Sequence, residues 1–280
     1  MTDGGAGAAG EAGASALLAP GRRALLLAYD GEAYSGWQVQ PDRPTVQGRL
    51  QEALGELFGE PVLVQGASRT DAGVHALGQV AHFDDPRGLP PERLAAALNR
   101  RLPPDVRVRG AAVVAPDFHA RHAARRKTYV YQLHLAGRAG LMPPHRRRSF
   151  HAVRAELDLA AMRAAAVQLV GVHDFTAVSR TMEPGRPTVR ELAALRVLRI
   201  PQGLRVVAVG DGFLYGMVRM LAGLLVDVGR GRRAPASVAA LLAARDRSRS
   251  PPSLPPQGLF LVRVRYATSG QDEPAFRLLS

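Results

Sequence analysis

A short segment of the sequence, residues 66–76, combines residue types that a reactive carboxylate needs. It reads GASRTDAGVHA, so Arg69 lies two residues before Asp71 and Gly73 two residues after it. An arginine close to a carboxylate keeps that carboxylate ionised, and glycine adopts backbone angles that let the chain turn sharply beside a ligand. The same letters suit an ordinary turn, because Asp side chains readily bond to their own backbone. The segment therefore predicts either a carboxylate-based site or a structural turn.

Two residues elsewhere in the chain also attract notice. Arg219 stands within a stretch that is largely apolar, residues 214–228. A buried charge is costly unless it is paired, so Arg219 is expected either to face a carboxylate or to lie on a solvated face. Tyr129 belongs to an alternating segment, with Tyr131 and Leu133 on the same side. Alternation by itself indicates an inward-facing core residue of a strand.

The elements that would position the segment 66–76 follow from hydrophobic periodicity and turn residues. It lies between two predicted strands, so Asp71 is expected at a strand edge. A helix capped by Thr45 is predicted to run to about Phe58, because apolar residues repeat every three to four positions. The further predicted strands are residues 24–29, 62–65, 79–83, 106–114, 127–135, 192–200, 204–209 and 259–266. The further predicted helices are residues 92–98, 158–170, 214–228 and 237–244.

This alternation of strands and helices in two halves predicts an α+β fold with two lobes. The predicted organisation is a Gly/Ala-rich disordered extension over residues 1–21, an N-terminal lobe over 22–118 carrying the Asp71 loop, a C-terminal lobe over 119–268 that completes the site, and a tail over 269–280.

Composition narrows the classes of function. The chain has 280 residues with 37 basic and 24 acidic side chains, giving a net charge of +13. Such an excess favours a nucleic acid, an anionic membrane surface or acidic ligands as partners. A GC-rich coding sequence would also produce it, because Lys127 is the only lysine. With no cysteine, thiol catalysis, disulfides and Cys-ligated zinc are excluded, and the histidines show no metal-ligand spacing. No apolar run is long enough to span a bilayer, and the expected location is the cytoplasm.

Eight blocks of the sequence, in order, resemble the TruA family of tRNA pseudouridine synthases. The most specific is SRTDAGVHA at residues 68–76. The others are YDG with YSGWQ at 29–38, QVAHF at 79–83, LN with LPPDV at 98–106, DFHAR with RKTYVY at 117–131, GVHDFT at 171–176, FLYGMVR at 213–219, and GLFL at 258–261. Together they cover about residues 22–268.

The resemblance implies a function and a set of site residues. The fold would be the pseudouridine synthase fold, with two lobes around a central, mainly antiparallel sheet and a cleft between them. The reaction would convert uridine to pseudouridine at positions 38–40 of the tRNA anticodon stem-loop, in a homodimer, without cofactor or metal. Asp71 would be the essential carboxylate, paired with Arg219. Tyr129 would stack on the uracil or assist proton removal, Leu261 would contact the base, and Arg69 would pair with Asp71 or help to extrude the base.

Basic residues outside this set are candidates for contacts with RNA phosphates. They are Arg125, Arg126, Lys127, Arg146, Arg147, Arg148, Arg232 and Arg233. Two other functions fit the composition. One is a non-catalytic RNA-binding module or RNA chaperone, which needs none of Asp71, Tyr129 and Arg219. The other is a structural oligomer whose arginine-rich surface reflects codon usage alone.

Overall fold

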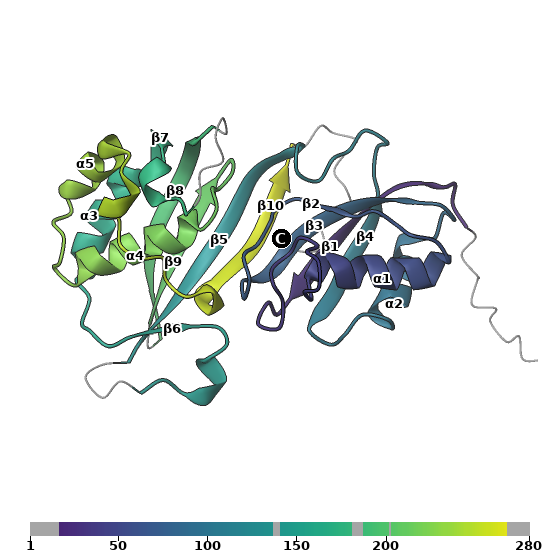
Figure 1. Ribbon diagram of the computed structural model, residues 1–280, viewed down its shortest axis with the longest axis horizontal. Helices are drawn as coiled ribbons and strands as arrows, with labels where there is room; N and C mark the ends of the chain where they lie inside the picture. Colours follow the sequence, from purple (N-terminus) through teal and green to yellow (C-terminus); the bar gives the residue numbers. More distant parts are fainter. Residues whose placement is uncertain (1–16, 137–140, 181–186, 202, 268–280) are drawn as a thin grey trace, which may run out of the picture.

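The computed structural model describes residues 17–136, 141–180, 187–201 and 203–267 of the chain. Its core is a mixed sheet of ten strands, eight of which run in the order β4-β1-β3-β10-β5-β9-β8-β7 (Figure 1). All pairings are antiparallel except β10 with β3 and β5 with β6. The strands are β1 Gly21–Tyr29, β2 Gln65–Gly66, β3 His75–Asp85, β4 Val106–Val113, β5 Ala124–Leu135, β6 His151–Val153, β7 Gly171–Asp174, β8 Val189–Ile200, β9 Gly203–Gly210 and β10 Leu259–Tyr266. The predicted α+β class with a mainly antiparallel sheet is confirmed.

Helices pack beside both halves of this sheet (Figure 1). They are α1 Val46–Phe58, α2 Pro91–Asn99, α3 Leu159–Leu169, α4 Met217–Gly229 and α5 Ser237–Ala244. The first matches its prediction: the Thr45 side chain accepts a hydrogen bond from the Gly48 N–H, and Gly59 ends the helix in the left-handed region. A stripe of buried apolar residues along α1 holds it on the core.

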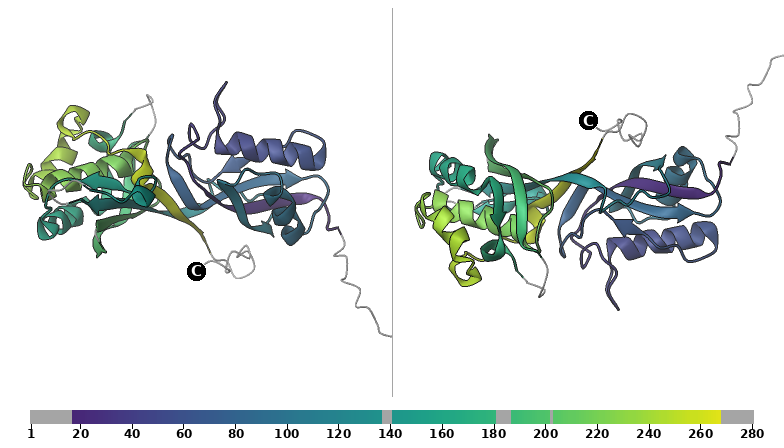
Figure 2. Two further views of the ribbon diagram at one scale, coloured as in Figure 1. Left: turned by 90° about the horizontal axis from the view of Figure 1, so that it is seen from below. Right: turned by 90° about the horizontal axis from the view of Figure 1, so that it is seen from above.

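Two strands join the lobes. In Figures 1 and 2, β5 and β10 run through the middle of the molecule, with α1 and α2 on one side and α3, α4 and α5 on the other. Leu261 of β10 is paired with Tyr129 of β5 and with Ala76 of β3. Because the Asp71 segment ends where β3 begins, this pairing brings it beside the strand that carries Tyr129.

Some predicted boundaries are wrong. The strand predicted over residues 62–65 is reduced to Gln65–Gly66, because only these residues pair with β3. The next strand starts at His75 rather than at residue 79, since Ala76 still pairs with Tyr29 of β1. Helix α4 begins at Met217, three residues later than predicted, because Gly216 precedes it with a φ of 71°.

Helix α3 also differs slightly from its prediction. The side chain of Asp158 caps its first turn by accepting from the Ala161 N–H, and the helix ends at Leu169, one residue before its predicted end. Val170 is extended, and Gly171 begins β7. Most of the predicted extension and tail, residues 1–16 and 268–280, lies outside the described residues. Within the described ranges, no helix is both long and apolar enough to cross a membrane.

Candidate active site

Asp71 lies in the loop that connects β2 to β3, and backbone hydrogen bonds hold this loop in shape. The Trp37 N–H donates to the Thr70 carbonyl at 3.1 Å, and the Gly73 N–H donates to the Tyr34 carbonyl at 3.2 Å. Within the loop, the Val74 N–H donates to the Asp71 carbonyl at 3.1 Å. The segment before α1 therefore holds the Asp71 loop on both sides of Asp71.

A glycine makes this close approach possible. Gly36 has a φ of 96°, and a Cβ placed on it would lie 2.5 Å from the Thr70 carbonyl oxygen. Real side chains do not tolerate such a separation, and a residue other than glycine is strained at that φ. The block YSGWQ resembles the family, but the sequence does not reveal that it supports the Asp71 loop. That role follows from the three-dimensional contacts.

Asp71 and Arg219 form an ion pair. The Arg219 Nη1 donates to Asp71 Oδ2 at 2.9 Å, and the Arg219 Nε donates to the Leu254 carbonyl at 2.7 Å. Only 12% of the Asp71 side chain and 9% of the Arg219 side chain are exposed. Burial raises the pKa of Asp71 above its usual value, while Arg219 and then Arg180 oppose that rise. The ion pair therefore favours the charged carboxylate in a place where burial disfavours it.

Tyr129 lies in the same pocket. Its hydroxyl shares a hydrogen bond of 2.8 Å with the Ser68 hydroxyl, and its ring meets Phe213 edge-on at 5.2 Å between centroids. Burial raises the pKa of Tyr129, so the phenol stays neutral at physiological pH. Its neighbour Tyr131 is fully buried and donates to the Pro255 carbonyl at 2.7 Å. Tyr131 is thus a core residue, as expected.

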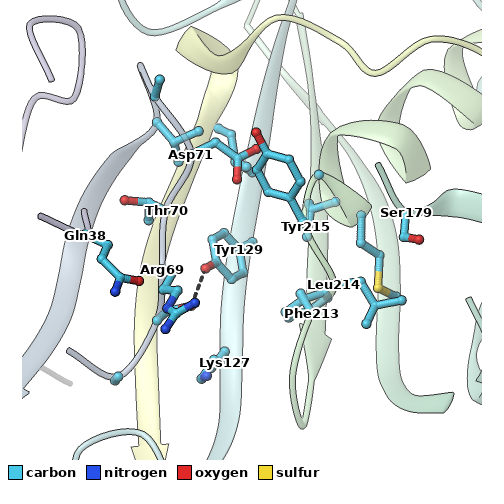
Figure 3. A pocket seen from close by; sticks show the side chains of 18 of the residues that line it. Gln38, Arg69, Thr70, Asp71, Lys127, Tyr129, Ser179, Phe213, Leu214 and Tyr215 are labelled. Atoms are coloured by element: carbon cyan, nitrogen blue, oxygen red, sulfur yellow. Dashed lines mark hydrogen bonds between the residues drawn. The ribbon is translucent and has the colours of Figure 1, made fainter. Parts of the chain in front are cut away.

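These side chains line a cavity of about 600 Å³. The Asp71 loop forms one wall, Phe213 to Val218 form the opposite wall, and Tyr129 and Lys127 of β5 lie between them (Figure 3). The volume suits a small ligand or a single nucleoside. Both lobes contribute, so the site exists only when the whole sheet is assembled.

Of the other two predicted substrate-binding residues, Arg69 and Leu261, only Arg69 lines the cavity. Arg69 is exposed and lines the cavity. Leu261 is fully buried and does not belong to the lining, whereas Leu259 does. The role expected for Leu261 stays a prediction.

Sequence reasoning missed Tyr215, which lines the cavity, and Arg180, which packs against it. Tyr215 is half-exposed, and the guanidinium of Arg180 lies over its ring at 5.3 Å. Arg180 also acts electrostatically on Asp71. Tyr215 stands within the block FLYGMVR, where only Arg219 was singled out, and no sequence pattern marks Arg180.

The predicted phosphate-binding residues lie at three places in the fold. The first group, Arg125 to Lys127, lies at the start of β5. The second group, Arg146 to Arg148, precedes β6, and the third, Arg232 and Arg233, follows α4. Several already have protein partners: Arg126 with Glu191 at 2.7 Å, Arg148 with Glu32 at 2.8 Å and Arg232 with Asp227 at 3.7 Å. Arg146 packs over Phe150, Arg233 donates to the Arg249 carbonyl, and Arg147 is exposed. Their contacts with RNA stay predictions.

In the described part of the chain, no cluster of His, Asp and Glu could hold a metal ion.

Comparison with known proteins defines the class. The sequence model of a family described as tRNA pseudouridine synthase matches residues 26–122 and 165–267. The chain belongs to this family. It is 44% identical to tRNA pseudouridine synthase A of Moorella thermoacetica, over 86% of this chain and 98% of the relative. It is 46% identical to the proteins of the same name from Myxococcus xanthus (88% and 92% covered) and Paracoccus denitrificans (88% and 97% covered).

Family membership decides between the functions that composition left open. The chain is an isomerase that acts on uridine in tRNA. A non-catalytic RNA-binding module on the same scaffold is not supported, because the relatives carry the name of the enzyme.

Proposed function

We propose that this chain converts uridine to pseudouridine at positions 38–40 of the tRNA anticodon stem-loop, with Asp71 as the catalytic carboxylate. The observation that carries the proposal is the Asp71–Arg219 ion pair of 2.9 Å on the wall of a nucleoside-sized cavity. A charged carboxylate held in a largely buried place, beside an aromatic ring, is what a reaction at a flipped uridine requires.

The chemistry needs no outside oxidant or reductant. The bond between N1 of uracil and C1′ of ribose breaks, the base rotates, and a bond from C5 to C1′ forms. The hydrogen on C5 leaves as a proton and N1 gains one, so product and substrate are isomers. A carboxylate can attack a carbon or stabilise positive charge on the ribose. Asp71 must be ionised and inside the cavity in each of three possible steps: attack on the ribose, attack on the base, and removal of a ribose proton.

The cavity also explains how the base is selected. A uridine stacked in an RNA helix cannot reach Asp71, so the base must turn out of the helix into the cavity. Tyr129 offers a ring against which uracil can lie, and Tyr215 stands at the mouth. The rest of the tRNA would be recognised through its shape and phosphates.

The subunit arrangement and the location follow from the TruA resemblance and the substrate. One tRNA would touch both subunits of a homodimer in the cytoplasm. Equilibrium sedimentation of the protein, alone and with tRNA, measures the number of subunits. A single chain in both conditions would contradict the dimer.

The decisive experiment is pseudouridine mapping on tRNA incubated with the purified protein. New pseudouridine confined to positions 38–40 is expected. Modification elsewhere would contradict the proposed position, and none at all would contradict the proposed activity. Asp71→Asn should abolish product while binding of tRNA survives. Release of tritium from C5-labelled uridine in tRNA gives a second readout, because only the isomerisation frees that hydrogen.

A further inference from the structure

Lys127, the only lysine of the chain, lies in an unusual position for a charged side chain. It is 9% exposed and lines the cavity (Figure 3). It lies two residues before Tyr129 on the same face of β5, a separation of about 7 Å along the strand. Among the described residues, the side chain of Lys127 makes neither a hydrogen bond nor an ion pair. Because a charge on a largely buried side chain costs free energy unless it is paired, and because Lys127 lines the cavity, the partner of its ammonium group is expected in the bound substrate.

The charges around Lys127 strengthen this conclusion. Burial, followed by the positive charges of Arg121 and Arg190, lowers the pKa of Lys127 to about 8, with Asp211 opposing. The carboxylate of Asp211 already accepts a hydrogen bond from the Glu191 N–H at 3.1 Å. Arg69, Arg121 and Arg190 also line the cavity. This end of the cavity therefore has an excess of positive charge and no carboxylate in contact with Lys127.

We propose that Lys127 binds a backbone phosphate next to the target uridine and so anchors the flipped nucleotide while its base lies against Tyr129. A phosphate is the anion that every RNA substrate brings, and it accepts hydrogen bonds from an ammonium group. A neutral uracil carbonyl would leave the excess charge uncompensated. This assignment separates Lys127 from Arg125 and Arg126, which do not line the cavity. It rests on the proposed function, because it assumes that a flipped uridine enters this cavity.

The test combines a protein variant with a modified RNA. Lys127→Met keeps the length of the side chain and removes its charge. Stem-loop RNAs are prepared in which one phosphate at a time, on either side of the target uridine, is a neutral methylphosphonate. Neutralising the contacted phosphate should raise the KM of the wild-type enzyme about tenfold, and should leave the already raised KM of Lys127→Met unchanged. Arg93→Gln on α2, an exposed site outside the cavity lining, is the matched control that loses one charge and should behave as wild type.

Two further measurements separate binding from a structural role. Loss of one phosphate contact should make the slope of log Kd against log salt shallower by about 0.7 to 0.9. The Tm of Lys127→Met should equal or exceed that of wild type, because an unpaired buried charge has been removed. If the effects of Lys127→Met and of every methylphosphonate on KM were fully additive, or if the salt slope were unchanged, the assignment would be overturned. Wild-type enzyme that makes no pseudouridine in the unmodified RNA would instead contradict the proposed function.

Discussion

Asp71 and Arg219 are 148 positions apart in the chain, yet their side chains meet at 2.9 Å. Asp71 belongs to a loop between β2 and β3, and Arg219 belongs to the first turn of α4. The Arg219 guanidinium is fixed at its other nitrogen by the Leu254 carbonyl. The pair thus connects the Asp71 loop to the opposite lobe and favours the charged form of the carboxylate at the same time.

Removal of Arg219 should shift the pH dependence of the reaction. Burial raises the pKa of Asp71, and Arg219 is the strongest group opposing that rise. In Arg219→Met the pKa of Asp71 should rise further, so the carboxylate becomes protonated at a higher pH. The acid limb of kcat/KM is expected to move to higher pH, with Arg219→Lys between the variant and wild type. An acid limb at its original place in Arg219→Met would show that it does not report Asp71.

The same ion pair makes a prediction for stability. Arg219→Met leaves a carboxylate largely buried without its partner, which costs about 3 to 5 kcal/mol. Asp71→Asn added to Arg219→Met removes that stranded charge, so the double variant should regain part of the free energy of unfolding. Urea denaturation of the wild type, both single variants and the double variant measures the coupling. Simple addition of the two single effects would mean that the pair contributes no specific interaction.

The hydroxyl of Tyr129 should matter more for turnover than for binding. The phenol is neutral and shares its hydrogen bond with Ser68. Tyr129→Phe keeps the ring for stacking but removes the group that can pass a proton, and general acid–base groups contribute about 10² to 10⁴ in rate. We expect kcat to fall by about 10² while KM changes little. Ser68→Ala, which leaves the hydroxyl in place, should have a much smaller effect; equal losses in the two variants would indicate that only the position of the ring matters.

Much of this fold could be predicted from local patterns. Helix α1 has a capping threonine, a periodic apolar face and a terminal glycine, and each acts over a few residues. Strand β10 was predicted with its observed bounds because its apolar run is short and clearly delimited. The start of α4 was not predictable from hydrophobicity, because the apolar run begins before Gly216 whereas the backbone angle of that glycine sets the boundary.

The site was predictable where a residue type is costly without a partner. Arg219 was expected either to face a carboxylate or to lie on a solvated face, and the structure places it against Asp71, as the family resemblance implies. The place of β10 between β3 and β5 depends on pairing between distant segments, for which the sequence carries no local pattern. For the same reason Arg180 and Tyr215 were missed, and the separation of Lys127 from Arg125 and Arg126 became visible only once the cavity was known.

Gly36→Ala should damage the site without removing any functional group. The new methyl group would overlap the Thr70 carbonyl, and the φ of 96° is strained for alanine, so we expect a loss of about 1 to 3 kcal/mol in stability. Because Thr70 precedes Asp71, the displaced loop should also lower kcat. Gly110→Ala in β4 is the control, since nothing lies within 4 Å of its added Cβ. Similar effects of the two substitutions on kcat would contradict the supporting role of Gly36.

Lys127 should give the reaction an alkaline limit. Its pKa of about 8 lies below the ordinary value of 10.5, so the ammonium form is lost as the pH rises through about 8. If this form holds a phosphate, kcat/KM, which reports the free enzyme, should fall above about pH 8. In the complex the phosphate favours the charged lysine, so the fall in kcat should occur at higher pH. The groups around Lys127 that carry charge are Arg69, Arg121, Arg190 and Asp211.

Deprotonation of Lys127 should also change the free energy of unfolding. Stability should rise with pH where kcat/KM falls. Because the folded pKa is below the unfolded one, the unfolded state binds more protons between about pH 8 and 10.5, and the free energy of unfolding rises with pH in that window. Lys127→Met removes this term, so its stability relative to wild type should decline over the same range. Its kcat/KM should also be low and lack the limb near pH 8. An alkaline limb that persists unchanged in Lys127→Met would assign it to the RNA or to another residue.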